Sequence, residues 1–333
     1  MATRMDQIGL IGDIGGTNAR FALTYLSAPE AQILDEHTFG DDRFATLREA
    51  AQEYLRQTGA EPKCATLAVA APITGDQITF ANRAWSFKRS ELQRALSLEQ
   101  LELINDFGAI GWAAPRLDAS LRVPMAGEVS EELQGPVTLI GPGTGLGVGL
   151  LVGPQEAGWR VVETEGGHAT FAATDDEERG IVRWIAARHQ RVYNELLLSG
   201  QGLSRIDAAL RGVQPVALPA PQTGVRTPKE IVDAALRGRD VDAKRALDRF
   251  CRSFGSVAGD VAMLHGARTL LIAGGIVLHF LDYFRTSGFM QYFIDKGPYA
   301  PYMQRIAVQV ITHPNPGLLG AAMAMRSSAK VDR

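Results

Sequence analysis

The stretch that organises this chain is GDIGGTN, residues 12–18, which stands between the apolar runs IGLI, residues 8–11, and RFAL, residues 20–23. The pattern predicts a strand, a tight glycine turn and a second strand. Glycines let backbone amides approach phosphate oxygens closely, and the Thr17 hydroxyl adds a further polar group. The Asp13 carboxylate is suited to hold the water shell of Mg²⁺, which needs only one or two carboxylates beside a triphosphate. The alternative is a plain hairpin in which Asp13 supports the turn.

A second stretch of the same design begins about 130 residues later. The apolar run VTLI, residues 137–140, leads into the loop GPGTG, residues 141–145, and the run LGVGLLV comes next at residues 146–152. Two such units, each near the head of one half of the chain, predict a duplicated fold. Neither loop continues into the Gly-Lys-Ser/Thr of a P-loop, and no G-x-G-x-x-G opens a dinucleotide-binding unit in the first half. The repetition favours phosphate binding over turn chemistry alone.

Strand and helix patterns alternate along the chain, which predicts α/β layering. We expect the helix at residues 175–197 to begin at a Thr174 N-cap, with Glu177 closing a capping box. Predicted helices are residues 44–55, 90–96, 175–197, 241–264 and 317–325, and further predicted strands are residues 65–71, 101–104, 269–273 and 305–312.

The residues Asn105 and Asp106 come directly after the predicted strand at residues 101–104. Ligands of α/β folds usually bind at the carboxyl ends of the strands. Asp106 is suited to accept a proton from an attacking hydroxyl, and the Asn105 amide can both donate to and accept from a substrate. Phosphoryl transfer needs its base late, so an ordinary aspartate pKa is no objection. The alternative is that the pair only caps the next helix.

A carboxylate and an imidazole stand three residues apart in Glu165-Gly166-Gly167-His168. The glycines can bend both side chains toward one small molecule, and vicinal sugar hydroxyls suit such a pair. Metal ligation is disfavoured because no cysteine cluster or second histidine is close in sequence. Glu195 falls in the last turn of its predicted helix, where the helix dipole disfavours a negative charge, which indicates a ligand or an arginine partner. The alternative is an ordinary carboxylate on the exposed face of the helix.

Two further features concern a nucleotide base and a substrate. Gly274 and Gly275 come after a predicted strand and would let a flat adenine ring approach the backbone, or they form an ordinary strand-to-helix turn. The segment NRAW, residues 82–85, is compatible with a polar substrate contact or with a hairpin edge.

Length and composition set further limits. The 333 residues exceed the ~250–300 at which one core stops growing, so two domains are expected. A net charge of −3 argues against a nucleic-acid partner. The two cysteines, Cys64 and Cys251, match neither a disulfide framework nor a zinc spacing, and the N-terminus lacks a signal-peptide pattern, so we expect a cytoplasmic protein. The uncharged residues 133–155 contain Pro142 and many glycines, which favours a buried hairpin over a membrane helix.

Taken together, these features resemble the bacterial glucokinase family, in the branch without the cysteine-rich zinc motif of the ROK group. The similarity runs over nearly the whole chain. The segments that carry it are GDIGGTNAR at 12–20, APITGD at 71–76, INDF at 104–107, GPGTGLGV at 141–148, EGGH at 165–168, ELLLSG at 195–200, AGGIV at 273–277 and NPGLLG at 315–320.

The resemblance implies an actin-like ATPase (ribonuclease H-like) fold, a duplicated α/β architecture of two domains with an interdomain cleft. The small domain would comprise residues 1–115 and 314–333, and the large domain residues 116–313. Members of this family are usually homodimers, so a homodimer is expected.

The resemblance also assigns roles to residues of this chain. Asp106 would be the catalytic base that deprotonates the 6-hydroxyl of glucose, and Asp13 would hold Mg²⁺ through water. The glucose-binding residues would be Asn105, Asp106, Glu165, His168 and Glu195. The residues that bind ATP would be Gly12, Asp13, Ile14, Gly15, Gly16 and Thr17 in the first loop, Gly143, Thr144 and Gly145 in the second, and Gly274 and Gly275 at the adenosine.

We therefore expect a glycolytic kinase that uses ATP and Mg²⁺ to convert D-glucose to glucose 6-phosphate, with no nucleic-acid or membrane partner. Two alternatives stay open. One is a kinase for another hexose, such as mannose, fructose or an N-acetylated sugar. The other is a non-catalytic sensor of ATP or sugar on the same fold, because a fold does not dictate a function.

Overall fold

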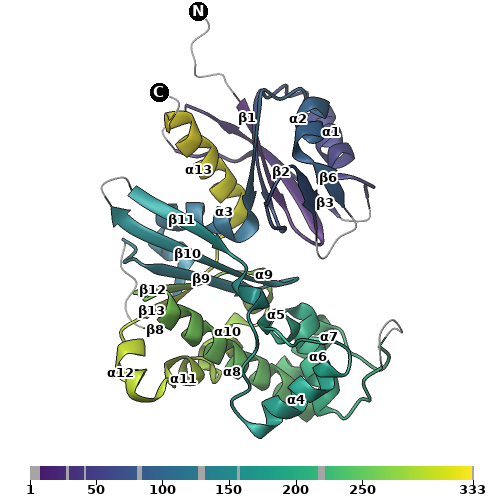
Figure 1. Ribbon diagram of the computed structural model, residues 1–333, viewed down its shortest axis with the longest axis vertical. Helices are drawn as coiled ribbons and strands as arrows, with labels where there is room; N and C mark the ends of the chain where they lie inside the picture. Colours follow the sequence, from purple (N-terminus) through teal and green to yellow (C-terminus); the bar gives the residue numbers. More distant parts are fainter. Residues whose placement is uncertain are drawn as a thin grey trace, which may run out of the picture. The chain divides into compact units, whose positions relative to one another are not determined.

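The computed structural model describes residues 8–27, 30–40, 43–80, 85–126, 132–155, 158–216 and 222–331. The chain forms two compact units, shown in Figure 1. Unit 1 comprises Met1–Asp118, Val161–Glu163 and His313–Arg333, and unit 2 comprises Ala119–Arg160 and Thr164–Thr312. The domain division expected from the sequence stays a prediction. The proposed substrate contact at residues 82–84 lies outside the described residues.

Unit 1 is built on a five-stranded sheet with the order β3-β2-β1-β4-β7. Strands β1 and β2 form the antiparallel hairpin predicted around the first glycine turn, and β4 and β7 continue from β1 in parallel. The bounds are β1 Ile8–Ile14, β2 Asn18–Tyr25, β3 Leu34–Gly40, β4 Cys64–Val69 and β7 Gln100–Asn105, with β5 Gln77–Thr79 and β6 Ser86–Lys88 in a separate two-stranded sheet.

Unit 2 contains a six-stranded sheet with the order β11-β10-β9-β12-β13-β8. Strands β9 and β10 form the second predicted hairpin, β12 and β13 continue from β9 in parallel, and β8 is antiparallel to β13. The bounds are β8 Arg122–Ala126, β9 Val137–Pro142, β10 Leu146–Gln155, β11 Gly158–Thr164, β12 Thr269–Ile272 and β13 Ala307–Ile311. The order of the first five strands repeats that of unit 1, so the predicted duplicated α/β fold is confirmed.

The sheet of unit 1 buries both faces because its side chains alternate. On β1, Leu10 and Ile14 join the cluster formed with helix α1, whereas Ile11 packs with helix α13. Side chains at odd positions of β1 therefore face α13, and this includes Asp13. The helices of unit 1 are α1 Leu47–Thr58, α2 Arg89–Ala95, α3 Asp106–Ala113 and α13 Pro316–Val331, with a 3-10 turn at Ala114–Arg116.

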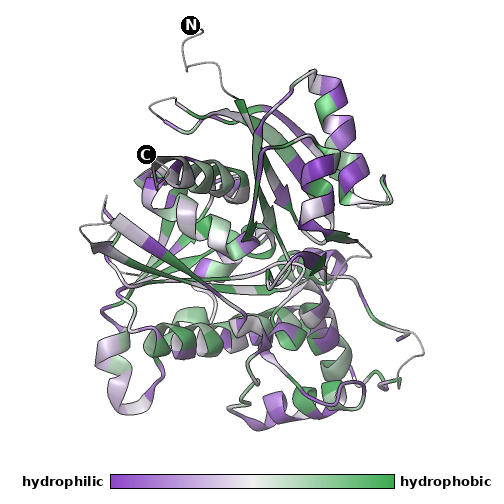
Figure 2. Cartoon of the chain, turned by 45° about the horizontal axis from the view of Figure 1, so that its top comes forward, coloured by the Kyte–Doolittle hydropathy of each residue, from purple (hydrophilic) through white to green (hydrophobic). Residues whose placement is uncertain are grey.

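Unit 2 has the larger core, which centres on the helix α8, Val241–Leu264. Its buried face, with Phe250 and Phe254, packs with Ile140 of β9 and Leu270 of β12. Figure 2 shows that strands are coloured mainly hydrophobic while helices mix hydrophobic and hydrophilic residues, as expected for helices that cover sheets. The other helices are α4 Asp176–Ala186, α5 Asn194–Leu197, α6 Gly200–Leu210, α7 Pro228–Leu236, α9 Gly275–Leu278, α10 Leu281–Thr286, α11 Phe289–Ile294 and α12 Ala300–Met303, with 3-10 turns η3 Ala119–Leu121, η4 Gly166–His168 and η5 Gly297–Tyr299.

One predicted helix, residues 175–197, is wrong as a single element. It divides into α4 and the short α5, because the chain between them turns to pair with residues 169–171: Phe171 N donates to Val192 O at 3.2 Å, and Asn194 N donates to Ala169 O at 2.9 Å. The N-cap also differs by one residue. It is Asp175, whose carboxylate accepts from Glu178 N at 2.8 Å.

The uncharged run at residues 133–155 contributes β9 and β10, as predicted. In the part of the chain that the structure describes, no helix has both the length and the apolar character needed to cross a bilayer. Cys64 and Cys251 are both free thiols.

Candidate active site

The first glycine turn connects β1 and β2, and Gly15 N donates to Asn18 O at 2.9 Å across it. Asp13 stands opposite Arg20 in the hairpin register, and Arg20 Nη1 donates to Asp13 Oδ2 at 3.3 Å. The carboxylate faces the start of α13, where a Cβ on Gly317 would lie 2.7 Å from Asp13 Cγ. Burial raises the pKa of the Asp13 carboxyl, against the opposing effect of Arg20. The turn thus carries a confined carboxylate beside exposed Thr17.

Asn105 and Asp106 lie where β7 ends and α3 begins. Asn105 is the N-cap of α3, and its Oδ1 accepts from Phe107 N at 2.9 Å and from Gly108 N at 3.2 Å. Its oxygen is therefore engaged, so the Nδ2 group is the part of Asn105 available to a substrate. Asp106 lies in the first turn of α3, and its Oδ1 accepts from Phe107 N at 2.9 Å. Asn105 therefore caps α3, as the alternative interpretation of the pair had it. This cap is compatible with a role of Asp106 toward a substrate.

The strand register brings this helix start to the same edge of the sheet as the first glycine turn. Val69 of β4 is the partner of both Ile14 on β1 and Asn105 on β7. Neighbouring strands lie about 4.8 Å apart, so Ile14 and Asn105 are roughly 10 Å apart along the carboxyl edge. In unit 1, Asp106 therefore comes directly after β7, and only β4 separates β7 from the strand that carries Asp13.

Glu163 of β11 has a role at this edge that the sequence did not reveal. Its Oε1 accepts from Asn105 N at 2.8 Å, and a Cβ on Gly108 would lie 2.4 Å from the same oxygen. Glu163 thus fixes the junction that carries Asn105 and Asp106. In the sequence, only its position two residues before Glu165 pointed to Glu163. The contact between Glu163 and Asn105 joins residues that are 58 positions apart, so local patterns could not show it.

The second glycine loop connects β9 and β10, and Gly143 N donates to Gly145 O at 2.8 Å. It lies beside Gly274, because β9 and β12 are paired neighbours. A Cβ on Gly141 would lie 1.5 Å from Ala273 O, and one on Gly274 would lie 2.6 Å from Pro142 O. Gly274 also has φ of +108°, a conformation that favours glycine. The second glycine loop, expected to bind phosphate, and Gly274, expected at the adenosine, therefore lie side by side within unit 2.

A helix start also meets this loop. Gly200, the first residue of α6, donates its N–H to Gly143 O at 2.9 Å, and Ser199 caps the helix by accepting from Gly202 N at 3.1 Å. The positive end of a helix stabilises bound anions. The structure thus adds a favourable electrostatic contribution to a loop already suited to phosphate.

Glu165, His168 and Glu195 gather around the first residues of β10. Glu195 Oε2 accepts from Leu146 N at 2.9 Å. The turn that carries Glu165 and His168 packs on the same strand, since a Cβ on Gly167 would lie 2.1 Å from Leu146 O. Glu165 and His168 are exposed, so both are available to a ligand in unit 2.

Glu195 differs from its predicted setting. It lies in the first turn of α5, not in the last turn of a long helix, so the helix dipole does not disfavour its charge. Its Oε2 accepts from the backbone amide of Leu146, and its charge also acts on the nearby guanidinium of Arg205, so an arginine is close to Glu195, as the sequence suggested.

Tyr193 is a second residue that sequence reasoning missed. Its ring stacks on His168 with centroids 4.7 Å apart and an interplanar angle of 21°. The stacking holds the imidazole in one orientation. An aromatic residue two positions before Glu195 was the only local signal.

Among the described residues, no group of three or more His, Cys, Asp or Glu side chains forms a metal site. A lone carboxylate such as Asp13 fits Mg²⁺ that keeps several waters and takes other ligands from nucleotide phosphates. The part of the chain that the structure describes therefore has no protein cage for a metal.

The comparisons with known proteins agree with this architecture. A family model described as Glucokinase matches residues 10–328. A glucokinase from Chromobacterium violaceum is 41% identical over 315 residues, which cover 94% of this chain and 88% of the relative. Sequence similarity thus extends over both units.

Solved structures give the same result. The crystal structure of a glucokinase from an Antarctic psychrotroph is similar with a TM-score of 0.78 and 33% identity, over 96% of this chain and 99% of that chain. A ROK family glucokinase from Streptomyces griseus, solved with glucose and AMPPNP, has a TM-score of 0.65 at 21% identity, over 96% of this chain and 99% of that chain, which shows the fold. On the family match and the identity to its relatives, the chain belongs to the glucokinase family.

Proposed function

We propose that this chain transfers the γ-phosphoryl group of ATP to the 6-hydroxyl of D-glucose, giving glucose 6-phosphate and ADP. The chain is an enzyme of the sugar kinase class, as its family membership indicates. The observation that supports the mechanism best is the register of unit 1. It places Asp106 at the carboxyl end of β7, at the same sheet edge as the glycine turn after β1.

In this proposal Asp106 is the base. The 6-hydroxyl donates to the Asp106 carboxylate, and its oxygen attacks the γ-phosphorus as the proton moves to the carboxylate. Phosphoryl transfer depends mainly on positioning and counter-charge. The Asn105 cap and the Glu163 contact with Asn105 N fix the helix start that carries Asp106, which supports a positioned base.

Glucose hydroxyls would be held by Asn105 Nδ2 and by the side chains of Glu165, His168 and Glu195. The last three gather around the start of β10, and His168 is held by stacking on Tyr193. The glucose named with the Streptomyces griseus structure supports the choice of sugar.

ATP phosphates would be held by Gly12 to Thr17 and by Gly143, Thr144 and Gly145, with Gly274 and Gly275 at the adenosine. Support comes from the second loop, which lies beside both Gly274 and the positive end of α6. Asp13 would hold Mg²⁺ through water. When bound, Mg²⁺ would neutralise charge on the phosphate oxygens.

We further propose that the enzyme works in the cytoplasm at the entry to glycolysis and forms a homodimer. Family membership supports these points. Light scattering coupled to size-exclusion chromatography tests the dimer, because a monomer mass would contradict it.

The function is tested by coupled ADP release with Mg·ATP across a panel of hexoses. We expect a strong response to glucose and weak responses to mannose, fructose and N-acetylglucosamine. A stronger response to another hexose would reassign the substrate. ATP binding without ADP release for any sugar would identify a sensor instead of a kinase.

A further inference from the structure

A pocket of about 510 Å³ lies in unit 2, away from the glycine loops. Its wall includes Thr269, the first residue of β12, and Ala307, the first residue of β13. The second glycine loop and Gly274 instead lie beyond the carboxyl ends of β9 and β12. A strand rises about 3.3 Å per residue, so the four residues of β12 separate the pocket from Gly274 by roughly 13 Å. Thr269 and Ala307 therefore place one end of the pocket at the opposite edge of the sheet from Gly274, and none of the described lining residues belongs to the candidate active site.

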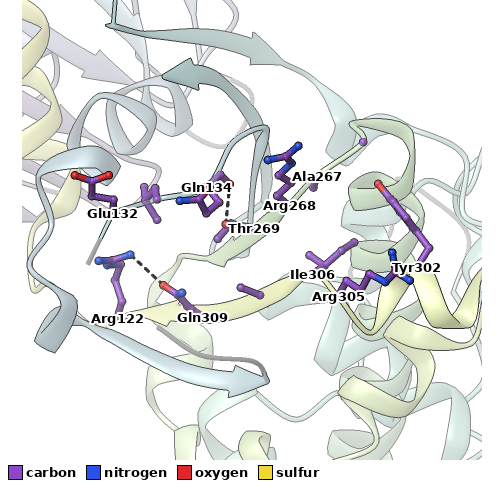
Figure 3. A pocket seen from close by; sticks show the side chains of 13 residues that line it. Arg122, Glu132, Gln134, Ala267, Arg268, Thr269, Tyr302, Arg305, Ile306 and Gln309 are labelled. Atoms are coloured by element: carbon purple, nitrogen blue, oxygen red, sulfur yellow. Dashed lines mark hydrogen bonds between the residues drawn. The ribbon is translucent and has the colours of Figure 1, made fainter. Parts of the chain in front are cut away.

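The described wall of the pocket is rich in arginine. Arg122, Arg268 and Arg305 line it, and among the described lining residues Glu132 contributes the one carboxylate. The whole chain has a net charge of −3, so this local excess of arginine runs against the general balance. Figure 3 shows Arg122 and Glu132 on one side of the pocket and Arg305 on the other. Such a concentration of charge favours an anionic ligand.

Arg122 forms a fixed part of the wall. Its side chain is buried, with 2% of the residue exposed, and its Nη1 donates to Gln309 Oε1 at 3.4 Å. The two residues come from the paired strands β8 and β13, and Gln309 is buried to the same degree. A guanidinium held in this way is oriented before any ligand arrives, which reduces the entropy lost on binding.

Arg268 and Arg305 are exposed and lie on backbone that is well anchored. Arg268 N donates to Pro136 O at 2.8 Å, and its carbonyl accepts from Ala307 N at 3.0 Å. Within the described residues, neither guanidinium forms an ion pair. Their charges are therefore available to a ligand from solvent.

We propose that this pocket binds a small phosphate monoester that carries hydroxyl groups, the class of sugar phosphates. The planar guanidinium matches phosphate oxygens with two parallel hydrogen bonds, which makes arginine well suited to phosphate. Neutral polar groups for hydroxyls come from Tyr302, Gln134 and Gln309 in the same wall. The volume falls within the ~300–1,000 Å³ typical of small-molecule sites. Nothing in this proposal depends on the reaction catalysed elsewhere in the chain.

The test is isothermal titration calorimetry with ribose 5-phosphate, a sugar phosphate that the proposed reaction neither uses nor makes. Inorganic phosphate is the second probe. The pocket variant is Arg268→Gln/Arg305→Gln, which removes two exposed charges. The control is Arg239→Gln/Arg285→Gln, which removes two other exposed charges of unit 2 outside the pocket.

We expect saturable binding of ribose 5-phosphate to the unaltered chain and to the control. The affinity should fall about tenfold or more in the pocket variant, because charge-assisted hydrogen bonds are lost. Glu132→Gln should strengthen binding, which gives a test of opposite sign. The proposal is overturned by absence of saturable binding, by equal affinity in the pocket variant, or by inorganic phosphate binding as tightly as the ester. A change in oligomeric state of the pocket variant without any heat of binding would instead assign this surface to a second copy of the chain.

Discussion

The two sheets share one strand order but differ in the residues that succeed their parallel strands. In unit 1, β7 leads into Asp106, and the hairpin strand β1 carries Asp13. In unit 2, the corresponding strand β13 leads into Thr312, and β12 leads into Ala273 and Gly274. The same scaffold thus presents carboxylates in one half and close-packed glycines in the other. The two halves therefore share a strand order, and they differ chemically in the residues that follow their parallel strands.

The glycines of the two hairpins also differ in their surroundings. A Cβ on Gly141 would lie 1.5 Å from the backbone oxygen of Ala273, whereas one on Gly12 would lie 2.7 Å from the flexible end of Leu67. Around Gly141 the neighbouring atoms belong to the backbone of Ala273 and cannot move aside for an added methyl group. Around Gly12 the neighbouring atom belongs to the side chain of Leu67, which can change rotamer.

The largest effect is expected from Gly141→Ala, with Gly12→Ala as its matched control. Gly141→Ala must displace β9 from the end of β12, so we expect a loss of about 3 kcal/mol or more in the free energy of unfolding. Gly12→Ala should cost about 1 kcal/mol, because Leu67 can change rotamer. Urea unfolding of both variants measures the difference, and equal losses would show that the two hairpins are equally constrained.

The next effect concerns sugar recognition in unit 2. Glu195→Gln keeps an acceptor for Leu146 N but loses the charge that would hold a glucose hydroxyl. A hydrogen bond to a charged group contributes about 1.5–3 kcal/mol, so KM for glucose should rise about tenfold or more while Tm stays unchanged. Glu91→Gln on the exposed face of α2 is the control. An unchanged KM for glucose in Glu195→Gln would show that the charge of Glu195 does not bind glucose.

The smallest effect tests the carboxylate of the first hairpin. Burial raises the pKa of Asp13 above its usual value of 3.8, so the folded state favours the protonated form. The contribution of Asp13 to stability is therefore present at low pH and is lost as pH rises through the raised pKa. Asp13→Asn escapes this loss and should raise Tm at neutral pH on the order of 2 °C, with less gain at pH 4. A lower Tm for Asp13→Asn at neutral pH would contradict the stated direction.

Much of the fold was predictable because its signals are local. Glycine turns between apolar runs identified both hairpins, and α8 has the predicted bounds of 241–264. The break between α4 and α5 was not predictable, because it depends on hydrogen bonds to residues 169–171 that compete with an otherwise continuous helical pattern. The position of Glu195 was wrong for the same reason.

The candidate site shows the same limit. Asp13, Asn105 and Asp106 were found from their places at predicted strand ends, and the register explains why those places share an edge. Glu163 and Tyr193 were missed because each acts on a residue that only the tertiary structure brings near: Glu163 on Asn105 N, and Tyr193 on the ring of His168.

The most direct test of the central claim is the turnover of Asp106→Asn with glucose and Mg·ATP. Asparagine keeps an acceptor for Phe107 N, so Tm should match that of the control Asp282→Asn, an exposed aspartate in the first turn of α10. We predict that kcat falls by about 10²–10⁴-fold, the range of general-base catalysis. Turnover of Asp106→Asn equal to that of the control would show that Asp106 is not the base.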